Sequence, residues 1–178
     1  MGLEIGVHLG NFSQQVLDVV HPAKFHLVDP WMYVADDEYK GSLYGGGKSD
    51  GQIMMDQRFD QVQQRFRSEI SRDIVTIHRA SSEDAVGVFS DEYFDWIYID
   101  GNHLYEFVKR DLDLYSSKVK DGGIIAGDDY GFPGWWNDGV TQAVDEFLSA
   151  GHAEMIGVRY GQFMLRKRAQ GSNPSSIR

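Results

Sequence analysis

The sequence predicts an α/β fold in three layers, with helices on both faces of a mostly parallel, seven-stranded sheet that ends in an antiparallel hairpin. Short continuous apolar runs alternate with helical stripes along the chain, which is typical of strands buried on both faces and separated by covering helices. The last two apolar runs are separated only by the turn Tyr160-Gly161, which favours a hairpin. The sheet is therefore expected to change from parallel to antiparallel near its end.

Strands are expected where apolar runs are short, and helices where apolar residues recur every three or four positions. The expected strands cover residues 3–8, 25–28, 74–77, 95–99, 124–126, 154–158 and 162–165, and two expected helices cover 12–20 and 82–89. Three longer helices are marked by the stripes Phe59, Val62, Phe66 and Ile70, then Val108, Leu112 and Tyr115 up to a break at Gly122-Gly123, and then Val140, Ala143, Val144 and Phe147. Residues 31–51 are expected to form a long glycine-rich loop, a length typical of a functional lid or of a disordered segment.

Composition restricts the class of protein. The chain has 178 residues, 42% of them hydrophobic, so we expect one domain over residues 1–168 and a disordered tail rich in Ser, Asn, Pro and Gly over 169–178. The net charge of -10 argues against a nucleic-acid partner, which needs a basic stripe. The lack of cysteine excludes disulfides and thiolate chemistry. No apolar run approaches the ~18 residues of a membrane span and no signal peptide is recognisable, so a cytoplasmic protein without membrane contact is expected.

The glycine pattern Glu4-x-Gly6-x-x-x-Gly10 lies where the first strand turns into the first helix. Glycines there let a ligand approach the backbone closely, although a tight turn without a ligand remains an alternative. The spacing differs from the G-x-G-x-x-G pattern of dinucleotide folds, and Glu4 would repel a pyrophosphate. A cationic ligand suits this turn better.

Polar residues also follow the next strands. Asp29 ends the second strand, about where nucleoside-binding α/β folds place an acidic residue on the ribose hydroxyls, and a simple turn before Pro30 is the alternative. Ser82 and Glu83 could contact an adenine edge after the third strand, while Ser81 or Ser82 caps the short helix. The carboxylates Asp100, Asp128 and Asp129 follow the fourth and fifth strands. Ligands of open parallel sheets bind at these carboxyl ends.

Together these motifs resemble the class I S-adenosylmethionine-dependent methyltransferases. The pattern is carried by Glu4-x-Gly6-x-x-x-Gly10-x-Phe12-Ser13, Val28-Asp29-Pro30-Trp31, Ile99-Asp100-Gly101-x-His103-x-Tyr105, Asp111-Leu112, Gly122-Gly123, Asp128-Asp129-Tyr130 and Gly139-Val140-x-x-Ala143-Val144-x-x-Phe147. It is most similar to the small-molecule and sugar O-methyltransferase group related to macrocin O-methyltransferase. The resemblance spans roughly residues 3–167 and implies a Rossmann-like fold.

The resemblance also implies roles for single residues. Glu4, Gly6, Gly10, Asp29, Ser82, Glu83 and Asp100 would bind the cofactor, and Asp100, Asp128 and Asp129 would hold Mg²⁺ as in metal-using relatives. His103 stands three residues after Asp100, where the catechol-type enzymes carry a catalytic lysine, and a histidine can accept a proton near neutral pH. We therefore expect His103 and Asp100 to be catalytic. Trp135 or Trp136 could stack on the acceptor.

The expected activity is therefore Mg²⁺-assisted transfer of a methyl group to a hydroxyl of a small molecule, a sugar or a glycosylated metabolite. A carboxylate-held cation lowers the pKa of a bound hydroxyl. The alternatives are a metal-independent methyltransferase with His103 as base, a non-catalytic cofactor-binding subunit, and a nicotinamide-dependent oxidoreductase, which Glu4 disfavours. Many relatives carry N-terminal helices over the acceptor, so the loop at 31–51 or a second subunit of a homo-oligomer is expected to supply the cover.

Overall fold

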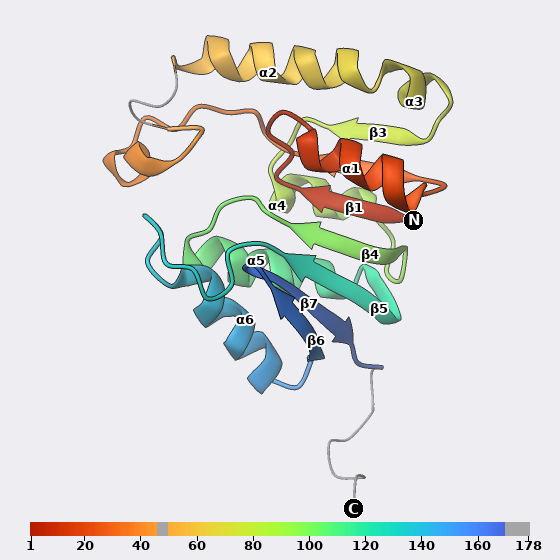
Figure 1. Ribbon diagram of the computed structural model, residues 1–178, viewed down its shortest axis with the longest axis vertical. Coiled ribbons are helices and arrows are strands. Elements are labelled where there is room, and N and C mark those ends of the chain that lie inside the picture. The colour runs from red at the N-terminus through yellow and green to blue at the C-terminus, as the bar shows by residue number, and fades with distance from the viewer. Residues whose placement is uncertain (46–49, 170–178) are drawn as a thin grey trace, which may run out of the picture.

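The computed structural model describes residues 1–45 and 50–169 and has a seven-stranded sheet at its centre (Figure 1). The strand order is β3-β2-β1-β4-β5-β7-β6. The strands are β1 (Gly2–Ile5), β2 (Phe25–Val28), β3 (Val75–His78), β4 (Phe94–Ile99), β5 (Val119–Gly127), β6 (Ala153–Arg159) and β7 (Gln162–Lys167). β1 to β5 run parallel, while β7 is antiparallel to both β5 and β6. The predicted fold class is confirmed.

Helices cover the sheet on both faces (Figure 1). They are α1 (Asn11–Val20), α2 (Gln52–Arg65), α3 (Arg67–Ser71), α4 (Ser82–Ala85), α5 (Tyr105–Ser116) and α6 (Gly139–Ser149), with the 3-10 turns η1 (Asp37–Gly41) and η3 (Val86–Val88). None of the helices within residues 1–45 and 50–169 is long and apolar enough to cross a membrane.

Two hydrophobic cores lie on opposite faces of the sheet. One joins β1, β4 and β5 to α5 and α6 around residues such as Leu3, Ile97 and Leu112. The other joins β2 to α1 and α2 around Phe25 and Val62. Because β1 lies between β2 and β4, the carboxyl ends of these strands meet at one edge of the sheet, where the predicted polar residues gather.

Part of the sheet is uncovered on the face that carries α1. There, an apolar groove of about 550 Å³ runs between α1 and the hairpin β6–β7 and is lined by side chains such as Trp96, Tyr98 and Met164. The ring of Phe12 stacks on Tyr98 with a centroid distance of 4.0 Å. Sheets with a parallel core are normally covered on both faces, so this groove is an unusual feature.

Three predicted boundaries were wrong. The first strand ends at Ile5 rather than residue 8, because Gly6 turns the chain with a φ of 88°. The helix expected from the stripe between Phe59 and Ile70 is interrupted at Phe66, and Ile70 is 38% exposed. Gly122-Gly123 does not separate a helix from a strand, because both glycines lie within β5, opposite an irregularity in the pairing with β4.

Other predicted details are confirmed. Ser81 caps α4, and its side chain accepts a hydrogen bond from the backbone N–H of Asp84. The hairpin turn at Tyr160-Gly161 has positive φ angles of 53° and 85°, as a two-residue turn of the primed type requires. The expected tail over 169–178 lies, apart from Ala169, outside the described residues.

Candidate functional site

The loop after β1 is held against the loop after β4. Gly6 has a φ of 88°, and a Cβ atom added to it would lie 2.0 Å from the backbone oxygen of Asp100. Only glycine fits this position, because any side chain would clash with the neighbouring backbone. The two loops therefore approach each other closely enough to form one continuous surface.

Asp29 fixes the glycine turn from the end of β2. Its carboxylate oxygen Oδ2 accepts hydrogen bonds from the backbone N–H groups of Val7 and His8, each at 2.9 Å, and Oδ1 accepts one from Trp31 at 2.7 Å. Burial raises the pKa of Asp29, although the three backbone donors act in the opposite direction. Asp29 thus shapes the turn and also lines a cavity beside it.

Glu4 is a buried acid on the same turn. Its side chain is 2% exposed, and Oε2 accepts a hydrogen bond of 2.6 Å from the hydroxyl of Ser13 on α1. Burial raises the pKa of Glu4 to about 8, with smaller contributions from the charges of Asp100 and Asp29. Glu4 is therefore largely protonated at neutral pH in the ligand-free chain, and a nearby cation would favour its ionised form.

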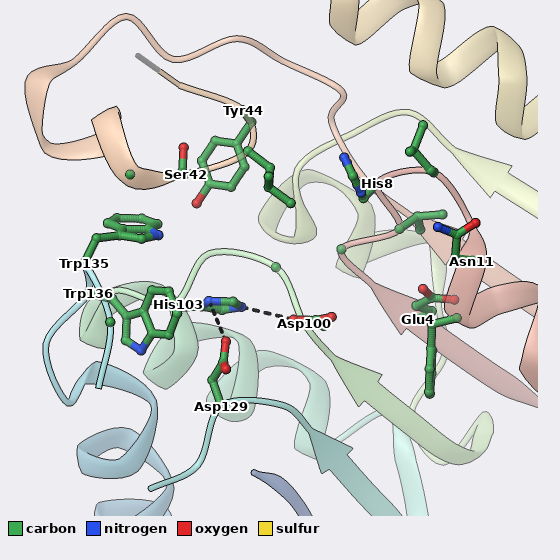
Figure 2. Close-up of a pocket in the computed structure, with 18 residues that line it drawn as sticks. Glu4, His8, Asn11, Ser42, Tyr44, Asp100, His103, Asp129, Trp135 and Trp136 are labelled. Carbon is green, nitrogen blue, oxygen red and sulfur yellow. Dashed lines mark hydrogen bonds and ion pairs between the residues drawn. The ribbon is translucent and has the colours of Figure 1, made fainter. Parts of the chain in front are cut away.

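Two adjoining cavities open at this edge of the sheet. The larger, of about 580 Å³, is lined by Glu4, Asp100, His103, Asp129 and the tryptophans 135 and 136 (Figure 2). The smaller, of about 380 Å³, is lined by Asp29, Ser82, Asn102 and Asp111 among others. Five residues line both cavities: Gly6, His8, Tyr44, Asp100 and Gly101. A ligand of sufficient length could therefore extend from one cavity into the other.

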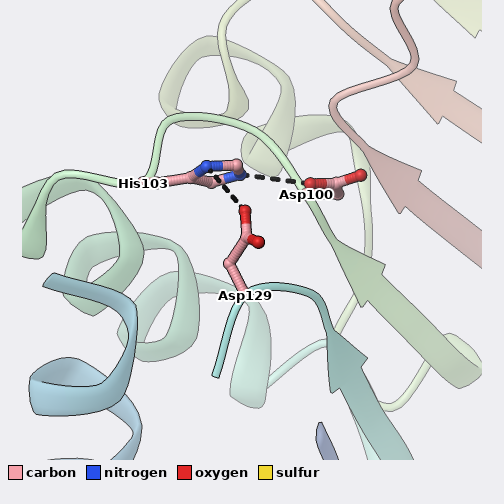
Figure 3. Close-up of side chains that lie close together, drawn as sticks. All are labelled: Asp100, His103 and Asp129. Carbon is pink, nitrogen blue, oxygen red and sulfur yellow. Dashed lines mark hydrogen bonds and ion pairs between the residues drawn. The ribbon is translucent and has the colours of Figure 1, made fainter. Parts of the chain in front are cut away.

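His103 lies between two carboxylates on the floor of the larger cavity (Figure 3). Its Nε2 atom is 3.1 Å from Oδ1 of Asp100, and its Nδ1 atom is 3.1 Å from Oδ2 of Asp129. The ring also packs edge-on against Trp136 at a centroid distance of 4.6 Å. Both ring nitrogens are thus held by acids while the ring is fixed by a tryptophan, which orients the imidazole toward the cavity.

The electrostatics of this group follow from burial and from neighbouring like charges. Burial raises the pKa of Asp100, and the negative charge of Asp128 acts in the same direction. Burial also raises the pKa of Asp129, with further increases from Asp128 and Asp100. His103 acts against the shift in both carboxyls. A positive charge at this position, a protonated imidazole or a bound cation, would stabilise both carboxylates.

The same three residues could hold a metal ion. One ligand atom each from Asp100, His103 and Asp129 lie within 4.8 Å of one another. Asp128, predicted as a metal ligand, is outside this group, and its Oδ1 instead accepts a hydrogen bond of 2.9 Å from the backbone N–H of Asp129. Asp129 has a positive φ of 63°, so Asp128 stabilises the turn that brings Asp129 to the cavity.

Two of the predicted cofactor residues lie away from the cavities. Gly10 caps α1 and is packed against Phe66, and Glu83 forms an ion pair of 2.8 Å with Arg110. Neither is among the described residues that line the two cavities. Ser82 does line the smaller cavity, and its hydroxyl donates a hydrogen bond to the buried Asp111, whose pKa burial raises to about 6.

The loop before α2 covers the larger cavity with aromatic side chains (Figure 2). Tyr39 and Tyr44 pack against Trp135 at ring distances of 5.5 and 6.5 Å. The hydroxyl of Tyr39 also accepts a hydrogen bond of 3.1 Å from the side chain of Asn102, in the loop after β4. A lid was predicted here from the sequence, but Tyr39 and Tyr44 were not identified, because their position depends on contacts with Asn102 and Trp135, which are distant in the sequence.

A family model described as "Methyltransferase domain" matches residues 3–130, well over half of the chain. No curated protein matches the sequence.

Solved structures share the fold at low sequence identity. A protein from Corynebacterium glutamicum is 12% identical with a TM-score of 0.68, and the match covers 97% of this chain and 74% of that one. A proposed caffeoyl-CoA O-methyltransferase from Staphylococcus aureus is 13% identical with a TM-score of 0.65, covering 93% and 75%. The O-methyltransferase NovP is 19% identical with a TM-score of 0.65, covering 94% and 71%.

Proposed function

Since the chain belongs to the methyltransferase-domain family of S-adenosylmethionine-dependent enzymes, we propose that it methylates a hydroxyl oxygen of a small molecule, a sugar or a glycosylated metabolite. The observation that carries this proposal is the imidazole of His103, held at 3.1 Å by Asp100 and by Asp129 on the floor of the larger cavity. A proton acceptor in that position suits a hydroxyl nucleophile. NovP, an O-methyltransferase that shares the fold, supports oxygen as the acceptor atom.

In this proposal the cofactor occupies parts of both cavities, and the acceptor occupies the rest of the larger one. The adenosyl part of the cofactor would occupy the smaller cavity beside Asp29 and Ser82, and its methionine part would extend past Gly6 toward Glu4 in the larger one. The sulfonium is cationic, and the buried Glu4 can supply the compensating charge when it ionises. The acceptor would occupy the remaining space below Trp135 and Tyr44, whose rings suit the apolar face of a sugar or an aromatic ring.

The transfer itself is a single displacement. The acceptor oxygen forms a bond to the methyl carbon while the carbon–sulfur bond breaks, and the sulfur keeps the electron pair and leaves as the neutral thioether. The proton of the hydroxyl passes to a ring nitrogen of His103, which the acceptor oxygen reaches by displacing the carboxylate that lies 3.1 Å from that nitrogen. The carboxylate at the other ring nitrogen stabilises the resulting imidazolium.

A magnesium-assisted version of this reaction remains a second candidate. It is supported by the ligand atoms of Asp100, His103 and Asp129 that lie within 4.8 Å of one another. Mg²⁺ prefers oxygen ligands, so Asp100 and Asp129 fit it directly, and the nitrogen of His103 is the less suitable ligand of the three. When bound, such an ion would acidify a coordinated hydroxyl.

The composition supports proposals on the number of domains, the location and the partners of the protein. We propose that residues 1–168 act as one domain in the cytoplasm without a nucleic-acid partner, which the net charge of -10 supports, and that a homo-oligomer is compatible with the site.

The test combines binding and turnover. S-adenosylhomocysteine is titrated into the purified chain by calorimetry, and release of the same product from S-adenosylmethionine is then followed with a panel of hydroxylated sugars and phenols. We expect binding and turnover, with kcat lowered about 10²- to 10⁴-fold in His103→Ala and unchanged in His152→Ala, an exposed histidine beside Phe147. Binding without turnover on any acceptor would favour a non-catalytic subunit. Binding of a nicotinamide cofactor instead would favour an oxidoreductase.

A further inference from the structure

The open face of the sheet beside α1 has the composition of a protein interface. Its groove of about 550 Å³ lies on β4, β5 and the hairpin β6–β7, and no helix of the described residues lies in front of these strands in Figure 1. Aromatic residues, Met and Arg are the types enriched at the centres of protein interfaces. Five side chains of these types line the groove: Phe12, Trp96, Tyr98, Arg159 and Met164. This composition favours a protein surface as the occupant of the groove.

The acidic residues of the chain avoid the groove. The chain carries 27 Asp and Glu residues and a net charge of -10, yet the described residues that line the groove include no acid. Arg159 is the one charged residue among them. Depletion of charge is typical of the centre of an interface. Two acidic molecules can therefore approach each other at this face without direct repulsion between carboxylates.

The helix beside the groove forms a ridge with apolar side chains on it. Val16 of α1 is buried in the wall of the groove, whereas Val19 and Val20 are 78% and 53% exposed. Met164 of β7 lines the groove and is 47% exposed. Contiguous exposed apolar side chains mark contact sites on soluble proteins. This face thus combines a groove with an adjoining ridge.

A groove with an adjoining ridge can fit a second copy of itself. The interface of a symmetric dimer uses the same patch on both copies, so the patch must be complementary to itself in shape and in charge. A two-fold axis parallel to the strands would lay α1 of each copy in the groove of the other. The helix α1 of one copy would then lie beside the hairpin β6–β7 of the other.

The charges at the rim of the groove meet the same condition. Asp18 is the only charged residue of α1 and is exposed. The hairpin contributes Arg159, which lines the groove, and Arg166, which is 52% exposed. Arg166 is paired across the sheet with Ile124, a lining residue, so its side chain lies on the same face. Contact between α1 and the hairpin of another copy therefore brings opposite charges together.

We propose that this face is the interface of a symmetric dimer, in which α1 of each copy occupies the groove of the other. The proposal does not depend on the proposed function. It does affect the site, because Phe12 lines both the groove and the larger cavity and stacks on Tyr98 at 4.0 Å. A second copy seated in the groove would hold the Phe12 ring and with it one wall of the larger cavity.

The test is sedimentation equilibrium of the whole chain over a range of concentrations. Val19→Glu places a charge on the ridge, and Asp18→Lys reverses the charge at its rim. Val88→Glu is the matched control, because Val88 is 65% exposed in η3 and is not among the described residues that line the groove. All three side chains are exposed, so thermal unfolding of each variant should remain close to that of the wild type.

We expect the wild type to dimerise below about 100 µM, and Val19→Glu and Asp18→Lys each to raise the dissociation constant about tenfold or more, with Val88→Glu within about twofold. Asp18→Lys makes the net charge less negative and would strengthen association limited only by overall repulsion, so a weaker dimer indicates the specific pairing. A wild-type chain that is monomeric at about 100 µM overturns the inference and leaves the groove to another occupant. A dimer that either variant leaves unchanged also overturns it, because that dimer uses another surface.

Discussion

The carboxyl of Glu4 is buried under α1 and accepts a hydrogen bond of 2.6 Å from the hydroxyl of Ser13. The pair ties the first strand to the helix that follows it. It also places an acid with a pKa of about 8 in the wall of the larger cavity, where its proton can be exchanged when a ligand binds.

The first prediction is that Glu4 makes the protein less stable as pH rises. Its pKa is about 8 in the folded chain against 4.5 as the ordinary value, so between these values the folded state holds the proton and the unfolded state has released it. The contribution of Glu4 to the free energy of unfolding is fully present below pH ~4.5. It decreases as the pH rises from ~4.5 to ~8, by a total of the order of a few kcal/mol. Urea unfolding of wild type and Glu4→Gln from pH 5 to 9 should show a smaller decline in the variant. Parallel pH profiles would contradict it.

The second prediction concerns the close contact between Gly6 and Asp100. Gly6→Ala should unfold the protein at a much lower temperature, because the new Cβ atom would lie 2.0 Å from the Asp100 oxygen at a φ of 88°. Gly51→Ala is the control that separates the steric contact from backbone strain, because Gly51 has a positive φ of 76° but open space around it. This control should lose only the backbone strain, about 1–3 kcal/mol. Equal losses in both variants, measured by thermal unfolding, would show that the contact is unimportant.

A third prediction follows from two histidines on neighbouring strands. Nδ1 of His26 lies 3.0 Å from Nε2 of His78, and burial lowers the pKa of His26 to about 4, with the charges of His78 and Lys24 acting in the same direction. Below pH ~6.5 His26 is protonated in the unfolded state but stays neutral in the folded state down to pH ~4. The free energy of unfolding therefore decreases as the pH falls from ~6.5 to ~4. His26→Asn should flatten the acid limb of urea unfolding curves. An acid limb unchanged in the variant would rule out this pair as its cause.

The fourth prediction distinguishes the two acids after β5. If Mg²⁺ binds, Asp129→Asn should weaken calorimetric Mg²⁺ binding at least tenfold and Asp128→Asn much less, because Asp129 belongs to the ligand group and Asp128 accepts the Asp129 N–H. Removal of metal with a chelator should lower turnover in proportion. Full activity after chelation would leave His103 as a metal-independent base, and the reverse order of the two variants would restore Asp128 as the ligand.

The strands and the acids that follow them could be predicted, because both leave local patterns in the sequence. Short apolar runs identify strands, and parallel strands bring their ends together, so Asp100 and Asp129 were expected at one site. Their exact pairing could not be predicted. It depends on the positive φ of Asp129, which turns this acid toward His103 and leaves Asp128 in the turn.

The remaining differences arise from tertiary contacts. Gly122 and Gly123 resemble a helix end in sequence, yet they continue β5 because the pairing with β4 is irregular there. Tyr39 and Tyr44 were missed because their position over the cavity depends on contacts with Asn102 and Trp135. Neither contact leaves a periodic signal in the sequence.

The order of the strands also limits how early the centre of the sheet can form during synthesis. β1 is made first, but its neighbour β4 begins only at Phe94, so the centre of the sheet cannot close until more than half of the chain has been made. At about 5–20 residues per second, a ribosome needs roughly 5–20 s to reach that point. Until then Leu3 and Ile5 remain without their β4 partners, so the hydrophobic core that they share with β4 forms late in synthesis.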